Sequence, residues 1–206
     1  MFIDNLFMEF VHFLCVKGGF FFTPFFRIIS LLGEKCWFFL LIAFLFCLRK
    51  KTRWIGITII FSIFLGYVIG DICLKPLIMR LRPYTANNKF QTYWALAGSY
   101  PEIEYSMPSG HCIGVAAFFI SFYITGKKSW RKNIMRVGVI SITLMILSRT
   151  YFMHHYLTDC LVGILIAFIT SYIAKSISKL LYDLCKRYEN IKIFNFVLNF
   201  DILKSK

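Results

Sequence analysis

The sequence contains few charged residues, and acidic residues are especially scarce. Only 17% of its 206 residues are charged, and 24 Lys and Arg stand against 10 Asp and Glu. A soluble domain is typically about a quarter charged and about half apolar, whereas 58% of this chain is apolar and 24 of its residues are Phe. The composition therefore excludes an ordinary soluble domain and favours a single membrane-embedded domain over residues 1–206.

Paired cysteines and a basic leader are also missing. None of the seven cysteines forms a C-x-x-C pair, and most lie inside apolar runs, which excludes a disulfide framework and a zinc site. The start of the chain, MFIDNLFMEF, carries acidic residues where a cleaved signal peptide would be basic. We therefore expect the cysteines to be small buried side chains and the first apolar segment to remain as a membrane helix.

Long apolar runs dominate the chain instead. A bilayer-spanning helix needs about 20 mostly apolar residues, and six candidate spans occur at 10–32, 36–48, 54–74, 112–125, 134–152 and 156–174. They predict an all-α fold, a polytopic membrane helical bundle of about six transmembrane helices. The first span is interrupted by Gly18, Gly19 and Pro24. It is therefore either a tilted or broken helix, or an interfacial segment followed by a short span.

The basic residues predict the orientation of the bundle. They gather in three segments, 49–53, 127–136 and 175–192, which six spans would place on one face. Short loops rich in Lys and Arg favour the cytoplasmic side, so this face, both termini and a tail at 186–206 are predicted to be cytoplasmic. Because these residues flank apolar spans rather than forming a polar face, no nucleic-acid partner is expected.

Three polar clusters are predicted to meet on the opposite, outer face. The first is KPLIMRLRP at 75–83, the second is PSGH at 108–111, and the third is SRTYFMHHYLTD at 148–159. All three lie at ends of predicted spans, within a motif core of about 54–174. The stretch 75–111 contains four of the five prolines. Long irregular loops often carry function, and ionisable groups beside a membrane span are costly to keep there.

Five residues of these clusters suit phosphate binding. Lys75, Arg82 and Arg149 supply fixed positive charge, and one Arg guanidinium can donate to two phosphate oxygens at once. Ser109 and Gly110 stand immediately before a predicted helix, where backbone N–H groups form an anion site and glycine permits close approach. We therefore predict that these five residues form a phosphate site.

Two histidines and a carboxylate supply a nucleophile and an acid, which phosphoryl transfer also requires. His155 and Asp159 are four residues apart, so a helix would place them on one face, whereas His154 and Asp159 would diverge. Asp159 would then accept the N–H of one ring nitrogen of His155 and leave the other with a free lone pair. This pattern predicts His155 as the nucleophile, His154 as its neighbour and His111 as the acid for the leaving alcohol.

Other charged residues near the clusters are assigned more ordinary roles. Arg80, Lys89 and Lys35 are interpreted as topology anchors beside spans. Asp71 lies inside the third span, where it either orients Lys75 one turn on or faces a polar cavity. The loop at 86–104 is expected to influence the choice of substrate.

The three clusters together resemble the signature of the type-2 phosphatidic acid phosphatase family, which shares its site with vanadium haloperoxidases. The family pattern is K-x6-R-P, then P-S-G-H, then S-R-x5-H-x3-D, and the clusters match it in order and spacing. The resemblance implies a six-helix membrane phosphatase that needs no metal or other cofactor. It implies phosphate binding by Lys75, Arg82, Ser109, Gly110 and Arg149, with His111 as general acid, His155 as nucleophile and Asp159 as its partner.

The resulting prediction is an integral membrane lipid phosphatase that hydrolyses a phosphomonoester or diphosphate of a lipid through a phosphohistidine. Candidate substrates are undecaprenyl pyrophosphate, phosphatidic acid, phosphatidylglycerol phosphate and similar lipids at the outer leaflet of a bacterial plasma membrane. The alternatives are a lipid-linked phosphotransferase using the same site and a non-catalytic membrane scaffold or transporter. The sequence selects no single lipid and indicates no oligomeric state.

Overall fold

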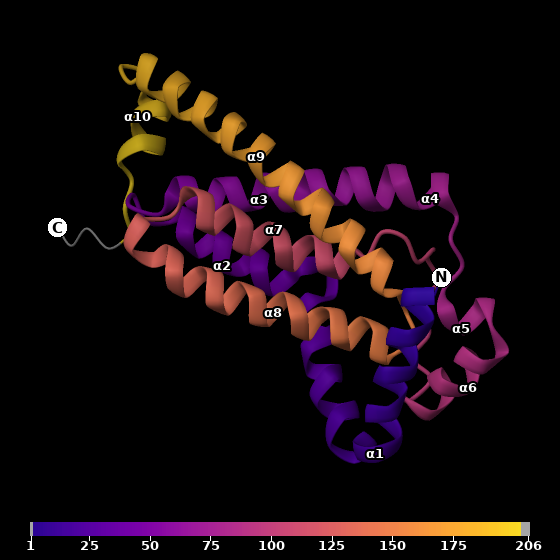
Figure 1. The fold of residues 1–206 in the computed structure, drawn as a ribbon. Coiled ribbons are helices and arrows are strands. Elements are labelled where there is room, and N and C mark those ends of the chain that lie inside the picture. The colour runs from indigo at the N-terminus through magenta and orange to yellow at the C-terminus, as the bar shows by residue number, and fades with distance from the viewer. Residues whose placement is uncertain (1, 203–206) are drawn as a thin grey trace.

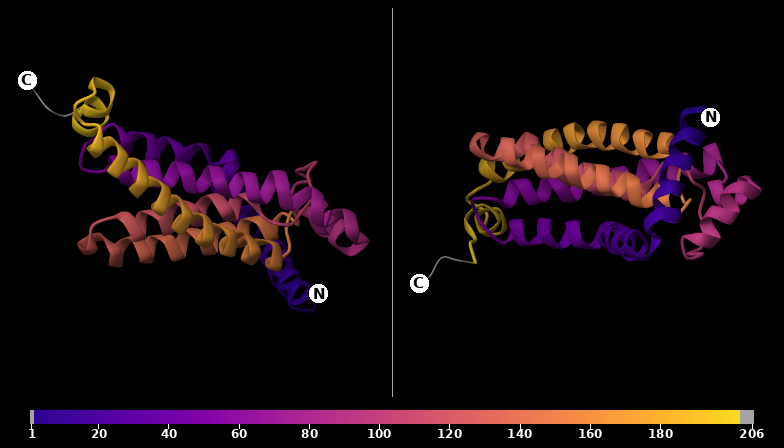
Figure 2. Two further views of the ribbon diagram at one scale, coloured as in Figure 1. Left: turned by 90° about the horizontal axis from the view of Figure 1, so that it is seen from above. Right: turned by 60° about the horizontal axis from the view of Figure 1, so that its bottom comes forward.

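The chain folds into a helical bundle. The computed structural model describes residues 2–202, and within this range no strand is present. The α-helices are α1 (Phe2–Gly33), α2 (Trp37–Cys47), α3 (Arg53–Tyr67), α4 (Lys75–Ile78), α5 (Pro83–Ala86), α6 (Asn88–Leu96), α7 (Gly110–Thr125), α8 (Arg131–Tyr151), α9 (Leu157–Arg187) and α10 (Lys192–Asn199). Shorter helical turns are η1 (Glu34–Cys36), η2 (Val68–Leu74) and η3 (Lys128–Trp130). Figures 1 and 2 show α2, α3, α7, α8 and α9 side by side, with α10 at one end and α5 and α6 at the other.

The core of the bundle forms around α7. Every residue from Cys112 to Phe118 is buried, and this stretch is rich in Gly and Ala. Small residues let helices approach closely in a membrane, where apolar side chains gain little by leaving lipid. A Cβ on Gly66 of α3 would lie 2.4 Å from Cγ2 of Ile113 on α7, so this approach requires glycine.

Buried hydroxyl groups connect the central helices. Ser171 of α9 is hydrogen bonded to Ser62 of α3 at 3.0 Å and to Ser121 of α7 at 3.1 Å. Interhelical hydrogen bonds of this kind replace the solvent that a membrane cannot supply. They fix the relative positions of the three helices that lead to the polar clusters.

α1 bends at Gly18 instead of forming one straight rod. Gly18 has φ −147° and ψ 27°, outside the helical region, and Figure 1 shows two arms of α1 meeting at an angle. The first arm lies against the α5–α6 end, where Met8 and Phe90 share a cluster. The second arm packs on α8, where the ring of Phe26 contacts that of Tyr151. Of the alternatives for the first span, the structure shows the broken helix.

Within residues 2–202, four helical stretches have the length and hydropathy to cross a membrane: Phe2–Cys47, Arg53–Ala86, Lys128–Tyr151 and Leu157–Arg187. Gly110–Thr125 is apolar but shorter. The predicted polytopic all-α bundle is therefore confirmed. The predicted number of about six transmembrane helices is not confirmed, because α1 and α2 form one bent stretch and α7 is shorter than a full span.

Asp4 and Ile202, near the two ends of the described range, lie at opposite ends of the bundle, whereas both termini were predicted to share one face. Asp4 accepts a backbone N–H at the start of α9, whereas the N–H of Ile202 donates to the carbonyl of Leu48 at the α2–α3 turn. The other end of α1 lies near α7, since a Cβ on Gly33 would be 3.0 Å from the His111 ring. α1 thus begins and ends at the same end. The helices α2, α3, α7, α8 and α9 run between the two ends of the bundle, so Asp4 and Ile202 come to lie at different ends (Figure 1).

The three basic segments do lie at one end, the end that carries α10. They occupy the α2–α3 turn, the α7–α8 turn and the end of α9. The chain after α9 packs against this end, because Arg53 donates to the carbonyl oxygen of Val197 at 2.6 Å and to that of Phe200. The predicted tail at 186–206 is therefore a folded segment as far as residue 202, and its last four residues lie outside the described range.

Candidate active site

The three polar clusters meet at the end of the bundle away from α10. Lys75 begins α4, Arg82 precedes α5, Ser109 precedes α7, and the third cluster forms the turn between α8 and α9. The five predicted phosphate ligands are buried except for the half-buried Gly110, and Arg149 is only 1% exposed. Burying several cations is costly unless anions compensate them. The arrangement therefore favours an anion-binding site.

Lys75 is positioned by the π-helical turn η2. Asp71 in this turn lies 2.5 Å from Nζ of Lys75, which is the first of the two roles that the sequence left open for Asp71. Widened turns of this type are frequent at functional sites. A Cβ on Gly110 would lie 3.1 Å from both carboxylate oxygens of Asp71. Glycine thus lets α7 begin directly against the Asp71–Lys75 pair.

His155 is held in one tautomer by a backbone carbonyl. Its Nδ1 lies 2.6 Å from the carbonyl oxygen of Ser106, and because a carbonyl only accepts, Nδ1 carries the proton. Nε2 retains the lone pair and lies 3.3 Å from Nη1 of Arg82. Arg82 is itself fixed by a 2.9 Å bond to the carbonyl oxygen of His154. Nε2 is therefore the unprotonated nitrogen, and it accepts a hydrogen bond from Arg82, a predicted phosphate-binding cation.

Asp159 does not hold His155 in the predicted way. Its Oδ2 lies 3.8 Å from Nδ1 of His155, beyond hydrogen-bond distance, and accepts the backbone N–H of Tyr156 at 2.8 Å. α9 begins only at Leu157, so His155 precedes the helix and the four-residue spacing does not place the pair on one helical face. Asp159 instead caps α9 and supplies a negative charge near His155.

Arg80 connects Asp159 to the first arm of α1. Its guanidinium donates to Asp159 at 2.5 Å, to the hydroxyl of Thr158 at 2.7 Å and to Asp4 at 3.0 Å. Asp4 is 2% exposed and also accepts the backbone N–H of Thr158 at 3.0 Å. The interpretation of Arg80 as a topology anchor is therefore wrong. The only sequence signal for its role is that it belongs to the KPLIMRLRP cluster.

Arg149 and Ser109 keep unpaired donors in the site. Nη1 of Arg149 donates to the hydroxyl of Ser30 on α1 at 2.7 Å, and Nη2 pairs with Glu102. Nε of Arg149 and Oγ of Ser109 are buried, and neither has a hydrogen-bond partner among the described residues. A buried donor without an acceptor is costly. The oxygen atoms of a bound phosphate are suitable acceptors for such donors.

His111 occupies the first turn of α7 and is half-buried. The start of this helix is joined to α9, because the N–H of Ser109 donates to the carbonyl of Asp159 at 3.1 Å. The predicted acid therefore stands at the same helix N-terminus that forms part of the predicted phosphate site.

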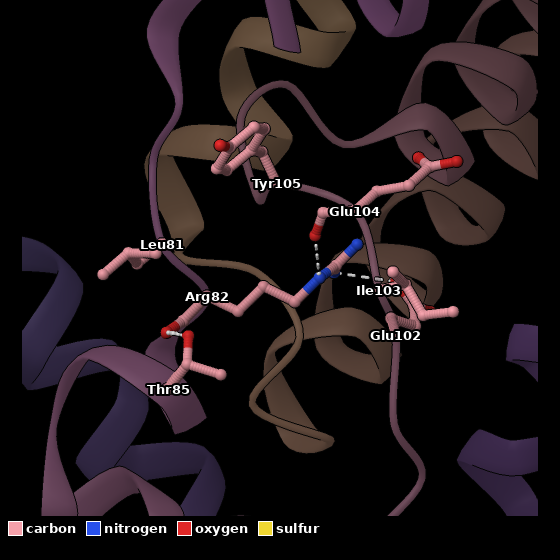
Figure 3. A pocket seen from close by; sticks show the side chains of 7 residues that line it. All are labelled: Leu81, Arg82, Thr85, Glu102, Ile103, Glu104 and Tyr105. Atoms are coloured by element: carbon pink, nitrogen blue, oxygen red, sulfur yellow. Dashed lines mark hydrogen bonds and ion pairs between the residues drawn. The ribbon is translucent and has the colours of Figure 1, made fainter. Parts of the chain in front are cut away.

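Two carboxylates that the sequence did not assign to the site enter it from the loop after α6. Glu102 pairs with Arg149 and, at 2.7 Å, with Arg82, while Glu104 pairs with Lys75. Figure 3 shows Arg82 reaching toward Glu102 and the backbone of Glu104. The cleft here has a volume of about 150 Å³ and is lined by Leu81, Arg82, Thr85, Glu102, Ile103, Glu104 and Tyr105. No motif or spacing marks the two glutamates, so only the fold identifies them.

Burial and positive charge keep both histidines of the α8–α9 turn neutral. Burial lowers the pKa of His155 well below 6.5, and Arg82 and Arg149 lower it further. Burial and Arg149 lower the pKa of His154 to about 3. Burial opposes ionisation of Glu102, but positive neighbours, Arg149 foremost, hold the pKa of that carboxyl well below its usual range. At neutral pH Glu102 is thus charged, and the imidazoles of His154 and His155 are uncharged.

Comparison with known proteins identifies the family. The PAP2 superfamily matches residues 51–182, which is more than half of the chain and includes all three clusters. An undecaprenyl-diphosphatase of Sulfolobus acidocaldarius is 32% identical over 128 residues, which cover 62% of this chain but only 57% of that relative. The crystal structure of a transmembrane PAP2-type phosphatidylglycerolphosphate phosphatase from Bacillus subtilis has the same fold, with a TM-score of 0.61 and 18% identity over 87% of this chain and 97% of that one. The chain therefore belongs to the PAP2 superfamily.

Proposed function

We propose that this chain is a membrane lipid phosphatase that hydrolyses a phosphomonoester or diphosphate of a lipid. The observation that carries the proposal is the neutral His155, whose Nε2 lone pair faces Arg82 among further buried cations. A neutral imidazole with one unprotonated nitrogen is a nucleophile, and fixed positive groups stabilise the charge of a transferring phosphoryl group. The two relatives, which are named as lipid phosphatases, support the same reaction.

In the proposed reaction Nε2 of His155 attacks phosphorus, and the bond from phosphorus to the leaving oxygen breaks. His111 donates a proton to that oxygen. Water then attacks the phosphorus of the phosphohistidine and gives a proton to His111, and the bond from phosphorus to Nε2 breaks. Inorganic phosphate is released, and His155 is again neutral with its lone pair on Nε2. Lys75, Arg82 and Arg149 neutralise the phosphate oxygens, and the N–H groups at the start of α7 add partial positive charge.

The segment between Lys75 and Arg82 suits the apolar part of a lipid. Leu77, Met79 and Leu81 are each more than half exposed beside the ionic site. Exposed apolar side chains at the end of a membrane bundle are expected to contact hydrocarbon. We therefore propose that the phosphate enters the cationic cluster while the lipid chain lies along this segment. Undecaprenyl pyrophosphate, phosphatidic acid and phosphatidylglycerol phosphate all have this form.

The proposed site faces the outside of the cell. The Lys- and Arg-rich turns lie at the opposite end of the bundle, and such turns favour the cytoplasm. On this orientation the C-terminus is cytoplasmic, whereas the first arm of α1 lies on the outer side with the site. The reaction then takes place at the outer leaflet of a plasma membrane, which we propose is bacterial.

The test is phosphate release by the purified protein in detergent, with a panel of lipid phosphates and with added alcohols or lipids as acceptors. We expect release of inorganic phosphate from at least one lipid without an acceptor. Turnover that depends on an acceptor would identify a phosphotransferase instead. No turnover with any lipid and any acceptor would contradict the enzyme proposal and favour a scaffold or transporter.

A further inference from the structure

The carboxylate of Glu102 forms ion pairs with the two arginines that a substrate phosphate would bind. One carboxylate oxygen, Oε1, pairs with Arg149, and the other, Oε2, pairs with Arg82 at 2.7 Å. Oε1 also lies 3.3 Å from Nδ1 of His154. The two arginines of the phosphate site are thus bridged by an anion that belongs to the chain itself. Two oxygens of a phosphate group would bridge them in the same manner.

The carboxylate of Glu102 can leave these arginines while the loop stays folded. The hydroxyl of Tyr84 donates to the carbonyl of Glu102 at 2.7 Å and accepts its backbone N–H at 3.1 Å. Further along the loop, the N–H of Ser106 donates to the carbonyl of Arg80 at 2.8 Å. The Glu102 side chain is 27% exposed. Rotation about its own side-chain bonds therefore takes the carboxylate toward the surface and leaves the backbone anchors in place.

Glu104 is the weaker of the two internal anions. It pairs with Lys75, which Asp71 already neutralises at 2.5 Å, and its side chain is 67% exposed. Exposed ion pairs contribute little to stability. Glu102, which pairs with two buried arginines, is therefore the anion that a ligand must displace.

We infer that Glu102 is an internal competitor for the phosphate site, an inference that rests on the proposed function. A phosphate group binds Arg82 and Arg149 only after the Glu102 carboxylate has left them. After hydrolysis, the returning carboxylate replaces inorganic phosphate. A lipid substrate gains apolar contacts in addition to its charge, whereas free phosphate does not. Glu102 thus keeps the site empty of product and of soluble phosphate.

Internal competition has a distinctive signature in binding. The same carboxylate must leave for every ligand, so it weakens the binding of each ligand by the same factor, whatever the ligand's charge. A fixed negative charge that remains beside the ligand would act differently. It would weaken the binding of a diphosphate more than that of a phosphate, because Coulomb energy scales with ligand charge.

The experiment is calorimetric titration of the detergent-purified protein with inorganic phosphate and with methylenediphosphonate, a diphosphate that is not hydrolysed. We expect Glu102→Gln to bind both anions about tenfold more tightly than wild type, and by the same factor, because a buried charge pair no longer has to be broken. Glu9→Gln is the matched control, since Glu9 pairs with the exposed Lys89 at 2.6 Å. It should leave both affinities unchanged.

Three results would overturn the inference: unchanged affinities in Glu102→Gln, weaker affinities, or a gain that is larger for the diphosphonate. Glu102→Asp keeps the charge but shortens the side chain, so it should give a smaller gain that is again equal for both anions. This second variant provides the test if Glu102→Gln does not fold. Binding is measured without turnover, so an inactive wild type would contradict the proposed function and leave the binding result interpretable.

Discussion

The connection from Asp4 through Arg80 to Asp159 predicts that variants of Arg80 and Asp4 affect the pKa of His155 differently. Arg80 neutralises Asp159, whose Oδ2 is 3.8 Å from Nδ1 of His155. An unpaired carboxylate at about 4 Å stabilises an imidazolium by about 4 kcal/mol at an effective dielectric constant of about 20, which corresponds to about three pKa units. Arg80 cancels part of this interaction. We therefore expect Arg80→Gln to raise the pKa of His155 by about one unit.

Asp4→Asn should act in the other direction. Without the charge of Asp4, Arg80 is paired with Asp159 alone and neutralises it more fully, so the pKa of His155 should stay constant or fall. The assay is the pH dependence of kcat/KM for a lipid phosphate. It should be bell-shaped, because His155 must be neutral and His111 protonated. The acidic limb should move up by about one pH unit in Arg80→Gln, but not in Asp4→Asn.

Both variants also remove contacts between α1 and α9, so a uniform loss of rate would reflect packing alone. Arg80→Lys keeps the charge and should retain the wild-type acidic limb. Shifts of equal size and sign in Arg80→Gln and Asp4→Asn, or no shift in either, would refute the electrostatic argument.

Packing, protonation and metal dependence provide three further tests. Gly56→Ala should destabilise the protein by about 1–3 kcal/mol and lower its melting temperature in detergent, because the new Cβ would lie 2.3 Å from the backbone oxygen of Ala43. Gly19→Ala is the control and should leave the melting temperature unchanged, because the nearest atom to its new Cβ would be 3.8 Å away. The pKa of His154 is about 3 in the folded protein, against an ordinary value of 6.5, so the unfolded chain takes up a proton first as the pH falls. The melting temperature should therefore decrease from about pH 6.5 toward pH 4, and His154→Gln should flatten the decrease. EDTA should leave phosphate release unchanged, as the family resemblance implies, and a loss of activity restored by Mg²⁺ would contradict this.

Motif spacing was sufficient to bring the three polar clusters together. Lys75, Ser109 and Arg149 all lie at ends of apolar runs, and the ends of antiparallel helices must meet at one surface of a bundle. The same reasoning placed the basic turns together at the other end. This inference does not depend on the exact bounds of any helix. It therefore agrees with the structure although the predicted number of spans does not.

The pairing of His155 with Asp159 failed because it assumed that both residues lie in a helix. α9 begins at Leu157, so the rule that residues four apart share a face does not reach back to His155. The residue that fixes the tautomer is Ser106, 49 positions earlier in the chain. A bond to a backbone carbonyl of an irregular loop leaves no pattern in the sequence.

The ion pairs of the site that join distant segments could not be predicted either. Asp4 and Arg80 are 76 residues apart, and Glu102 and Arg149 are 47 apart. Such contacts depend on the bend of α1 and the course of the loop after α6, which local periodicity does not encode. The glycine at position 18 indicated that the first span is interrupted, but not that the arm before it returns to the site.

The most direct test of the account is phosphate release from a lipid phosphate by wild type, His155→Ala and His154→Ala, combined with a search for phosphate bound to histidine in the quenched wild-type enzyme. We expect release by wild type and by His154→Ala, none by His155→Ala, and phosphohistidine at position 155. Release by His155→Ala together with an inactive His154→Ala would show that the nucleophile has been assigned to the wrong histidine.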